Sequence, residues 1–239
     1  NQIQAAGRLS DLPLPDEETL SLDAGGGFIL PGLIDTHVHV MLEGISIPKM
    51  MTTPFSKRFY ESISRLKTTL EAGITSVRDA GGADLGVKMA VEQGLVSGPR
   101  MQISITILSI TGGHVDGWMP SNLVLDILPE YPGMPANVCD GVDGVRQKVR
   151  EVLRAGAEVI KICATGGVLS PTDDPQFTQF SPEELAVIVQ EAAYRKGTKV
   201  MALAQGAEGI KTAVRAGVHS IEHGIFLDEV GMEVMLERG

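Results

Sequence analysis

Hydrophobic and polar positions follow two alternating patterns along this chain. Short apolar runs rich in β-branched residues predict strands, and they lie in LPGLIDTHVHV, ITSVRDAGG, RMQISITILS, EVIKICATGG, KVMALAQG and HSIEHG. Stretches with apolar residues at helical spacing separate these runs and predict helices over residues 59–72, 142–155, 181–197, 208–216 and 228–236. The order predicts about six βα units in succession.

Two segments refine this picture. Ser181, Pro182 and Glu184 supply an N-cap, a favourable first-turn proline and a capping-box acid, so a helix should begin there. Residues 110–140 have no clear periodicity and are rich in Gly, Pro and Asn. Because a connector of this length is uncommon in a compact domain, we interpret it as a functional loop over the catalytic end of the fold.

Alternating strands and helices predict an α/β fold with a parallel sheet, either an open doubly wound sheet or a (β/α)₈ barrel of the TIM type. Periodicity does not distinguish the two. Polar residues, however, recur where the predicted strands end: His37 and His39, Arg78 and Asp79, His114, Lys161, Gln205 and His223. A barrel brings all of these to one mouth, so we favour a barrel, with residues 31–239 forming it incompletely.

Composition and charge exclude several classes of protein. Thirty acidic and twenty basic residues give a formal charge of −10, and the basic residues are scattered, so nucleic acid is not an expected partner. No apolar run reaches the ~18–20 residues of a membrane span, and the N-terminal residues do not resemble a secretion signal. Two cysteines are too few for a disulfide framework, which favours a reducing cytoplasm.

His37 and His39 lie two apart at the end of an apolar strand. The period of a strand places both rings on one face, where they could bind a divalent metal. An isolated H-x-H pair is also compatible with two ordinary histidines.

Lys161 falls within a predicted buried strand, where a bare ammonium is costly. One interpretation is that the stem crosses the core and the amine reaches water. The other is that burial lowers its pKa until the neutral amine adds carbon dioxide, which gives a carbamate that can bridge two metal ions.

His223 ends the last predicted strand, and alternation should point the neighbouring Glu222 to the opposite face. A single histidine at a strand end is often a hydrogen-bonding residue. Three such histidines and a buried lysine at one mouth favour a metal site.

The motifs PGLIDTHVHV, GITSVRDAGG, TGGHVDGW, VIKICATGG and GVHSIEHG together resemble the amidohydrolase superfamily, in particular its imidazolonepropionase-like and prolidase-like branch. The resemblance runs from about Phe28 to the end of the chain. It implies a distorted (β/α)₈ barrel with one or two divalent metal ions, usually zinc. His37, His39 and His223 would be metal ligands, Lys161 the carboxylated bridging lysine and catalytic residue, and His114 a substrate contact.

The chain departs from the pattern of this superfamily in three places. Leu203 stands where the fifth strand should supply a histidine ligand, and a leucine cannot bind a metal. The resemblance also implies an Asp after an eighth strand, which we do not find. Residues 1–30 would be a remnant of a small β-sandwich domain. A full barrel takes about 250 residues, so we interpret the chain as truncated, with open strand edges that favour a homo-oligomer.

The leading functional hypothesis is a metal-dependent hydrolase that cleaves an amide or related C–N bond in a small molecule, such as a dipeptide, an N-acyl amino acid or a cyclic amide. The alternative is a non-catalytic relative that keeps the scaffold and acts as a binding protein, which Leu203 favours. A dinucleotide-binding enzyme is disfavoured, because no G-x-G-x-x-G turn follows the first strand.

Overall fold

The protein is described here by a computed structural model, which covers residues 2–13, 16, 18–44, 46–168 and 173–239. The chain divides into two compact units, Asn1–Pro31 and Gly32–Gly239. The described part of the first unit contains the short 3-10 helix η1 (Leu9–Asp11) and no strand. Its assignment to a β-sandwich remnant stays a prediction.

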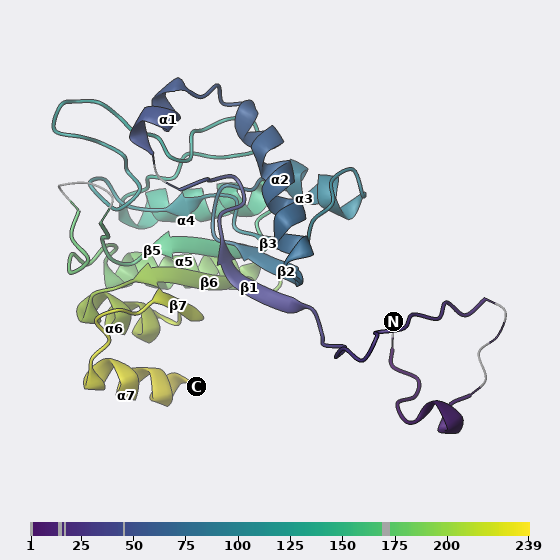
Figure 1. The fold of residues 1–239 in the computed structure, drawn as a ribbon. Helices are drawn as coiled ribbons and strands as arrows, with labels where there is room; N and C mark the ends of the chain where they lie inside the picture. The colour runs from purple at the N-terminus through teal and green to yellow at the C-terminus, as the bar shows by residue number, and fades with distance from the viewer. Residues whose placement is uncertain (1, 14–15, 17, 45, 169–172) are drawn as a thin grey trace. The chain divides into compact units, whose positions relative to one another are not determined.

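The second unit is built on parallel strands with helices outside them (Figure 1). One sheet has the order β1 (Leu33–Val38), β2 (Ile74–Asp79), β3 (Arg100–Ile103), and the other has the order β4 (Ile107–Leu108), β5 (Val159–Cys163), β6 (Lys199–Ala204), β7 (Ser220–His223). Every pairing between neighbouring strands is parallel. This is the α/β fold of an incomplete TIM-type barrel, as predicted.

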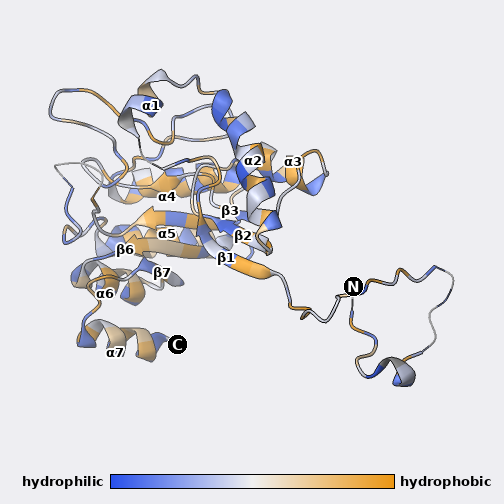
Figure 2. Ribbon diagram, in the orientation of Figure 1, coloured by the Kyte–Doolittle hydropathy of each residue, from blue (hydrophilic) through white to orange (hydrophobic). Residues whose placement is uncertain are grey.

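The described part of this unit contains seven helices, of which the last follows β7: α1 (Ile47–Thr52), α2 (Lys57–Glu71), α3 (Leu85–Glu92), α4 (Gly141–Arg154), α5 (Pro182–Tyr194), α6 (Ala207–Ala216) and α7 (Glu229–Arg238). The predicted helices match α2, α4, α6 and α7 to within two residues and α5 to within three, and α1 and α3 were not predicted. The capping box at Ser181 and Glu184 forms as expected. The helices carry both hydrophobic and hydrophilic residues, as elements with one buried face should (Figure 2).

The third predicted strand is not continuous, which corrects the prediction for RMQISITILS. Ile105 has φ of 67°, a left-handed conformation that no extended strand contains. The backbone N–H of Thr106 donates to the carbonyl of Ser104 (2.8 Å), which completes a tight turn. The segment is therefore divided into β3 and β4, and the sheet changes partner strands at this point.

Strand β5 is buried on both sides, as a central strand of a barrel should be. Ile160 and Ile162 join the large hydrophobic cluster that includes helix residues of α4 and α5. Val159 and Met201 belong to a separate small cluster, and Met201 is the register partner of Lys161. Because side chains alternate along a strand, Lys161 lies on the inner side with Val159.

The long segment 110–140 packs over the carboxyl ends of the strands. Its ends are joined where Thr111 donates to Asp140 from both N–H (3.0 Å) and Oγ1 (2.7 Å). Leu128 is buried and lies next to Gly81, directly after β2. The predicted position of this loop at the carboxyl ends of the strands is confirmed, while its functional role stays a prediction.

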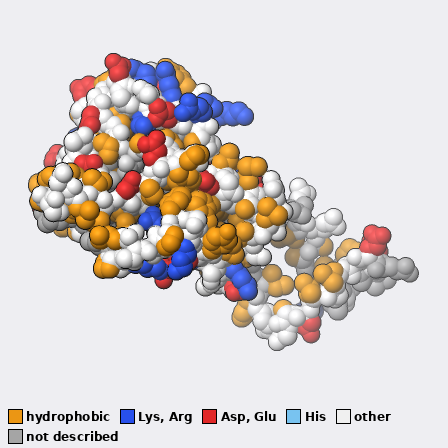
Figure 3. All heavy atoms as spheres, turned by 90° about the horizontal axis from the view of Figure 1, so that it is seen from above, with side chains coloured by type: hydrophobic (Ala, Val, Ile, Leu, Met, Phe, Trp, Pro, Cys, Tyr) orange, Lys and Arg blue, Asp and Glu red, His pale blue; other side chains and the backbone are white. Residues whose placement is uncertain are grey.

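The outer surface carries charged side chains together with hydrophobic ones (Figure 3). The face seen from above groups hydrophobic side chains between charged ones (Figure 3). Exposed hydrophobic side chains on α2 include Tyr60 and Ile63. No helix in the described ranges is both long and apolar enough to cross a bilayer.

Candidate functional site

The two histidines of the first strand lie side by side at its carboxyl end, as their spacing predicts. The ring centroids of His37 and His39 are 5.4 Å apart. His39 Nδ1 is 2.9 Å from the carbonyl oxygen of Gly81, and since a carbonyl only accepts, Nδ1 carries the proton. His37 Nδ1 is 2.8 Å from a carboxylate oxygen of Glu222, which fixes the same tautomer. Nε2 of each ring is left as the nitrogen that could bind a metal.

Burial has a strong effect on His39. It lowers the pKa of the ring to about 4, and the charges of His37, Lys161 and His223 act in the same direction, against the raising effect of the Gly81 carbonyl. His39 is therefore neutral at physiological pH. A neutral imidazole is the form that binds metals.

His223 joins the same cluster but corrects the expectation for Glu222. The ring centroids of His223 and His37 are 5.0 Å apart, and Glu222 contacts His37 as well. Strict alternation would send the two side chains to opposite faces, but His223 has φ of 73°. This left-handed residue turns the backbone, so the prediction of opposite faces was wrong.

Lys161 is the most unusual residue of the site. Only 1% of it is exposed, and within the described part of the chain its Nζ has no hydrogen-bond partner. Burial lowers its pKa to about 8. Its charge in turn contributes to the lowered pKa values of His39 and His223, so the amine lies near both rings. The expectation that the amine reaches water is not met.

Glu222 is held by a network that sequence reasoning missed. Its Oε1 accepts from Arg78 Nη2 (2.7 Å) and Ser220 Oγ (2.9 Å), and its Oε2 faces His37. Burial alone would raise the pKa of Glu222, but the hydrogen bonds from His37 and Ser220 and the charge of Arg78 lower it to about 2. The signal in the sequence was a pair of opposite charges on two predicted strands.

Asp79, at the end of β2, organises the turn that holds His39. Its carboxylate is fully buried and accepts from the N–H groups of Val40 (2.9 Å), Gly81 (3.0 Å) and Ala83 (3.2 Å). Gly81 has φ of 139°, and a Cβ there would lie 2.5 Å from Ile107. The D-A-G-G sequence is therefore required to aim the Gly81 carbonyl at His39.

Leu203 lies in the interior layer where the resemblance places a ligand. It pairs in register with Cys163 on one side and Glu222 on the other, and it is buried. Gln205, the next residue on the same face, has its N–H bonded to Thr165 Oγ1 (2.9 Å). Whether position 203 is a ligand position stays a prediction.

His114 comes from the long loop and lies near the histidine cluster. Its Nδ1 pairs with Asp173, its ring packs on Gly167, and it is close enough to affect the pKa of His223. A Cβ on Gly167 would overlap the ring, at 2.1 Å from Cε1. The T-G-G turn after β5 therefore makes room for His114 at the mouth. Its role as a substrate contact stays a prediction.

The donor atoms determine whether a metal fits here. Among the described residues, no three side chains of the His, Cys, Asp and Glu types are arranged to hold a metal ion. The histidines therefore fit a metal only with a further donor, and the unpartnered buried amine of Lys161 is a group that can supply one. The four predicted residues are thus brought together, while their function as ligands is not tested by the geometry.

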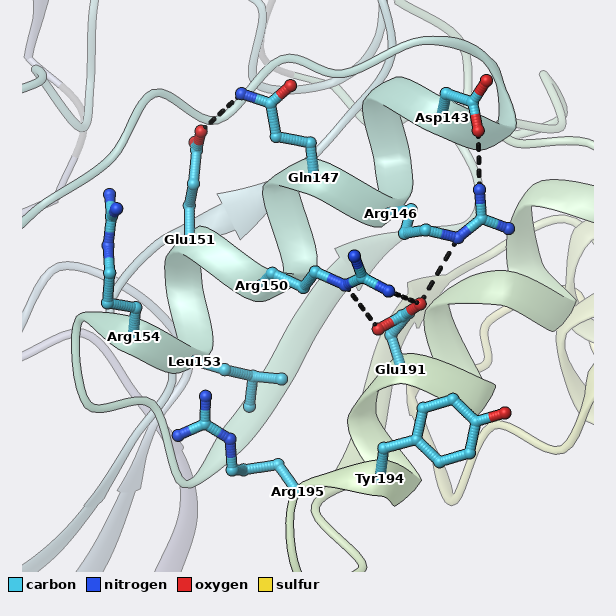
Figure 4. A pocket seen from close by; sticks show the side chains of 10 residues that line it. All are labelled: Asp143, Arg146, Gln147, Arg150, Glu151, Leu153, Arg154, Glu191, Tyr194 and Arg195. Atoms are coloured by element: carbon cyan, nitrogen blue, oxygen red, sulfur yellow. Dashed lines mark hydrogen bonds and ion pairs between the residues drawn. The ribbon is translucent and has the colours of Figure 1, made fainter.

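A separate groove of about 670 Å³ lies between α4 and α5 (Figure 4). In this groove the carboxylate of Glu191 accepts hydrogen bonds from Nε (2.9 Å) and Nη2 (2.8 Å) of Arg150. Arg146 Nε lies 3.3 Å from Oε1 of the same carboxylate. Because these charges are paired with one another, the groove has no chemistry comparable to that of the histidine cluster.

Comparison with known proteins agrees with the fold and the motifs. The chain is 39% identical to ochratoxinase of Aspergillus niger over 223 residues, which covers 88% of this chain and 46% of that protein. It is 25% identical over 269 residues to imidazolonepropionase of Hyphomonas neptunium, covering 100% and 62%. A prolidase solved in complex with N-methylphosphonate-L-proline superposes with a TM-score of 0.85 at 44% identity, over 96% of this chain and 56% of the other.

The chain thus spans about half the length of these ochratoxinase and prolidase relatives. Residues 28–239 match the Amidohydrolase family. This range includes every strand and helix of the larger unit. The resemblance inferred from the motifs is confirmed, and the chain belongs to the amidohydrolase family.

Proposed function

We propose that this chain carries the metal-binding half of a hydrolase that cleaves amide bonds in small molecules. The observation that carries the proposal is the convergence of three histidine rings on a buried lysine whose amine has no hydrogen-bond partner among the described residues. A structural lysine in a protein interior is normally paired, so a purpose beyond folding accounts better for Lys161.

Lys161 would act through its neutral amine. The lowered pKa increases the share of neutral amine near pH 7, and its nitrogen lone pair can form a bond to the carbon of CO2 while one N–H proton leaves to solvent. The product is a carbamate with two oxygen donors in place of the orphaned nitrogen. The carbamate is an anion, so a bound divalent ion would offset the cost of burying its charge.

His37, His39 and His223 would hold one or two divalent ions, with zinc expected, together with the lysine carbamate. When bound, such an ion supplies a water of lowered pKa and polarises the carbonyl of the substrate. The chain's own residues orient the donors: Gly81 fixes the ring of His39, and Glu222 fixes the ring of His37.

Substrate recognition would use the long loop. His114 is held by Asp173 at the mouth, and because its Nδ1 faces a carboxylate and carries the proton, its other ring nitrogen can accept a hydrogen bond from an N–H group of the substrate. The prolidase solved with N-methylphosphonate-L-proline supports an amide formed with an amino acid, so we infer a dipeptide or N-acyl amino acid, with a cyclic amide as the remaining class. Homo-oligomeric assembly and a cytoplasmic location stay predictions.

A second candidate function is supported by Leu203. An alkyl side chain in the interior layer removes a donor, and a non-catalytic binding protein would tolerate that loss. The metal content of the purified chain and its hydrolysis of a panel of Xaa-Pro dipeptides and N-acyl amino acids separate the two. The hydrolase requires about one or more tightly held ions per chain. A chain without metal and without hydrolysis at saturating zinc and bicarbonate would contradict the proposal.

A further inference from the structure

Glu222 and the arginine that holds it make a contact whose purpose the fold does not explain. The carboxylate of Glu222 is 7% exposed and receives hydrogen bonds from three side chains. Arg78 and Ser220 share Oε1, and His37 takes Oε2 at 2.8 Å. A buried ion pair contributes little net stability in comparison with apolar residues, so this network suggests a role in orientation.

The network is rigid because three strands contribute to it. Arg78, on β2, donates from Nε to the carbonyl of Thr36 on β1 (2.7 Å) and from Nη1 to Ser220 Oγ on β7 (3.2 Å). Its planar guanidinium therefore has all three nitrogens engaged, and its Nη2 pins one oxygen of Glu222. Only the second oxygen is left for His37.

We propose that Glu222 is a positioning residue that holds His37 in the Nδ1–H tautomer, so that Nε2 stays unprotonated and available as a donor to a metal ion. The value of this arrangement for catalysis rests on the proposed function. The hydrogen bond itself does not, because it joins two side chains of this chain directly.

The physical argument follows from which groups can donate. An ionised carboxylate only accepts, so the ring nitrogen that faces it must carry the proton. A neutral imidazole has one proton, which leaves Nε2 with a free lone pair. A ligand histidine whose second nitrogen bonds a carboxylate is a recurrent arrangement in metal sites, and loss of the carboxylate typically costs about 10- to 100-fold in metal affinity.

Glu222→Gln tests this directly. Arg78 can only donate, so it should select the amide oxygen of Gln, which turns the amide NH2 toward His37. Nδ1 would then have to accept, and the proton would move to Nε2. Glu191→Gln is the matched control, because Glu191 is also buried (6% exposed), is also paired with arginine, and contacts no histidine (Figure 4).

The readout is the tautomer of His37 from long-range ¹H–¹⁵N correlations in the metal-free chain, followed by zinc titration against a competing chelator. The wild type and the Glu191→Gln variant should show Nδ1–H. The Glu222→Gln variant should show Nε2–H and bind zinc about 10- to 100-fold more weakly.

Two results would overturn the proposal: an Nε2–H tautomer in the wild type, or an unchanged tautomer and zinc affinity in the Glu222→Gln variant. The first can be read even if the variant does not fold. If the tautomer switches as described but the wild type binds no zinc, the positioning role stands and the proposed metal-dependent function fails.

Discussion

Two lysines are buried in the described part of this protein, and their amines have opposite environments. Lys211 on α6 is 7% exposed, but its amine reaches Glu208 (2.7 Å) and Asp228 (3.0 Å), two carboxylates that are themselves exposed to solvent. Lys161 on β5 is 1% exposed, and its amine has no hydrogen-bond partner in the described residues. Lys211 has the stem-buried, amine-paired arrangement that an ordinary structural lysine adopts.

The two lysines differ in the direction of their pKa shifts although both side chains are buried. The hydrogen bond to Glu208 raises the pKa of Lys211, whereas burial lowers the pKa of Lys161 to about 8. A fold selected only for stability would pair or remove Lys161. The chemistry that needs an unpaired amine is therefore the most direct account of its position.

The largest difference is expected from replacing each lysine with methionine. Lys161→Met should reduce zinc affinity by more than about 100-fold, because it removes a donor rather than a residue that supports one. It should leave the free energy of unfolding unchanged or increase it, since an unpaired buried ammonium is lost. Lys211→Met should leave zinc affinity unchanged.

Urea unfolding and zinc titration of the three proteins check this prediction. A large loss of stability in Lys161→Met would mean that the amine has a stabilising partner, and the contrast between the two lysines would disappear.

The two lysines should also give opposite dependences of stability on pH. The folded pKa of Lys161, about 8, lies below its ordinary value of 10.5, so the unfolded chain binds more protons between these values. The free energy of unfolding should therefore rise on the order of 3 kcal/mol from pH 8 to 10.5, relative to Lys161→Met. The raised pKa of Lys211 contributes stability below pH 10.5 that is lost as pH rises through the folded value.

Urea unfolding at a series of pH values, in buffer free of CO2 and metal, measures both effects. The account fails on this point if the difference between wild type and Lys161→Met has no slope with pH.

Asp79 extends the comparison to a buried carboxyl group that accepts three backbone hydrogen bonds; burial raises its pKa to about 7, against the lowering effect of these bonds. Asp79→Asn should lower the free energy of unfolding by about 1–3 kcal/mol, because the amide NH2 would face a backbone N–H where the carboxylate accepts. Chemical denaturation measures the loss. Stability equal to that of the wild type would show that the three N–H groups do not depend on this side chain.

Leu203→His tests the comparison in the other direction, because it adds a donor at a position where the chain has an alkyl side chain. If position 203 is a ligand position, an imidazole beside the lysine strand should raise zinc affinity by at least about tenfold. Competitive zinc titration measures this change. Equal affinity of the two proteins would show that our alignment of this strand with the family is mistaken, and Gln205 would become the next residue to test.

The sequence predicted the strands, most helices and the gathering of His37, His39, Lys161 and His223, because strand-end positions in a barrel share one mouth. It did not predict the division of β3 from β4, nor the turn at His223 that brings Glu222 to His37. Both depend on left-handed residues, Ile105 and His223, which carry ordinary side chains and so give no local signal. The Arg78–Glu222 contact joins residues 144 positions apart, which no pattern of spacing reveals.

The most direct test of the central claim is to look for a carbamate on Lys161. The purified chain is incubated with ¹³C-bicarbonate and zinc, and its ¹³C spectrum is compared with those of Lys161→Met and Lys211→Met. The account predicts one carbamate carbon signal in the wild type and in Lys211→Met, and none in Lys161→Met. A wild type without this signal, or a signal that persists in Lys161→Met, would contradict it.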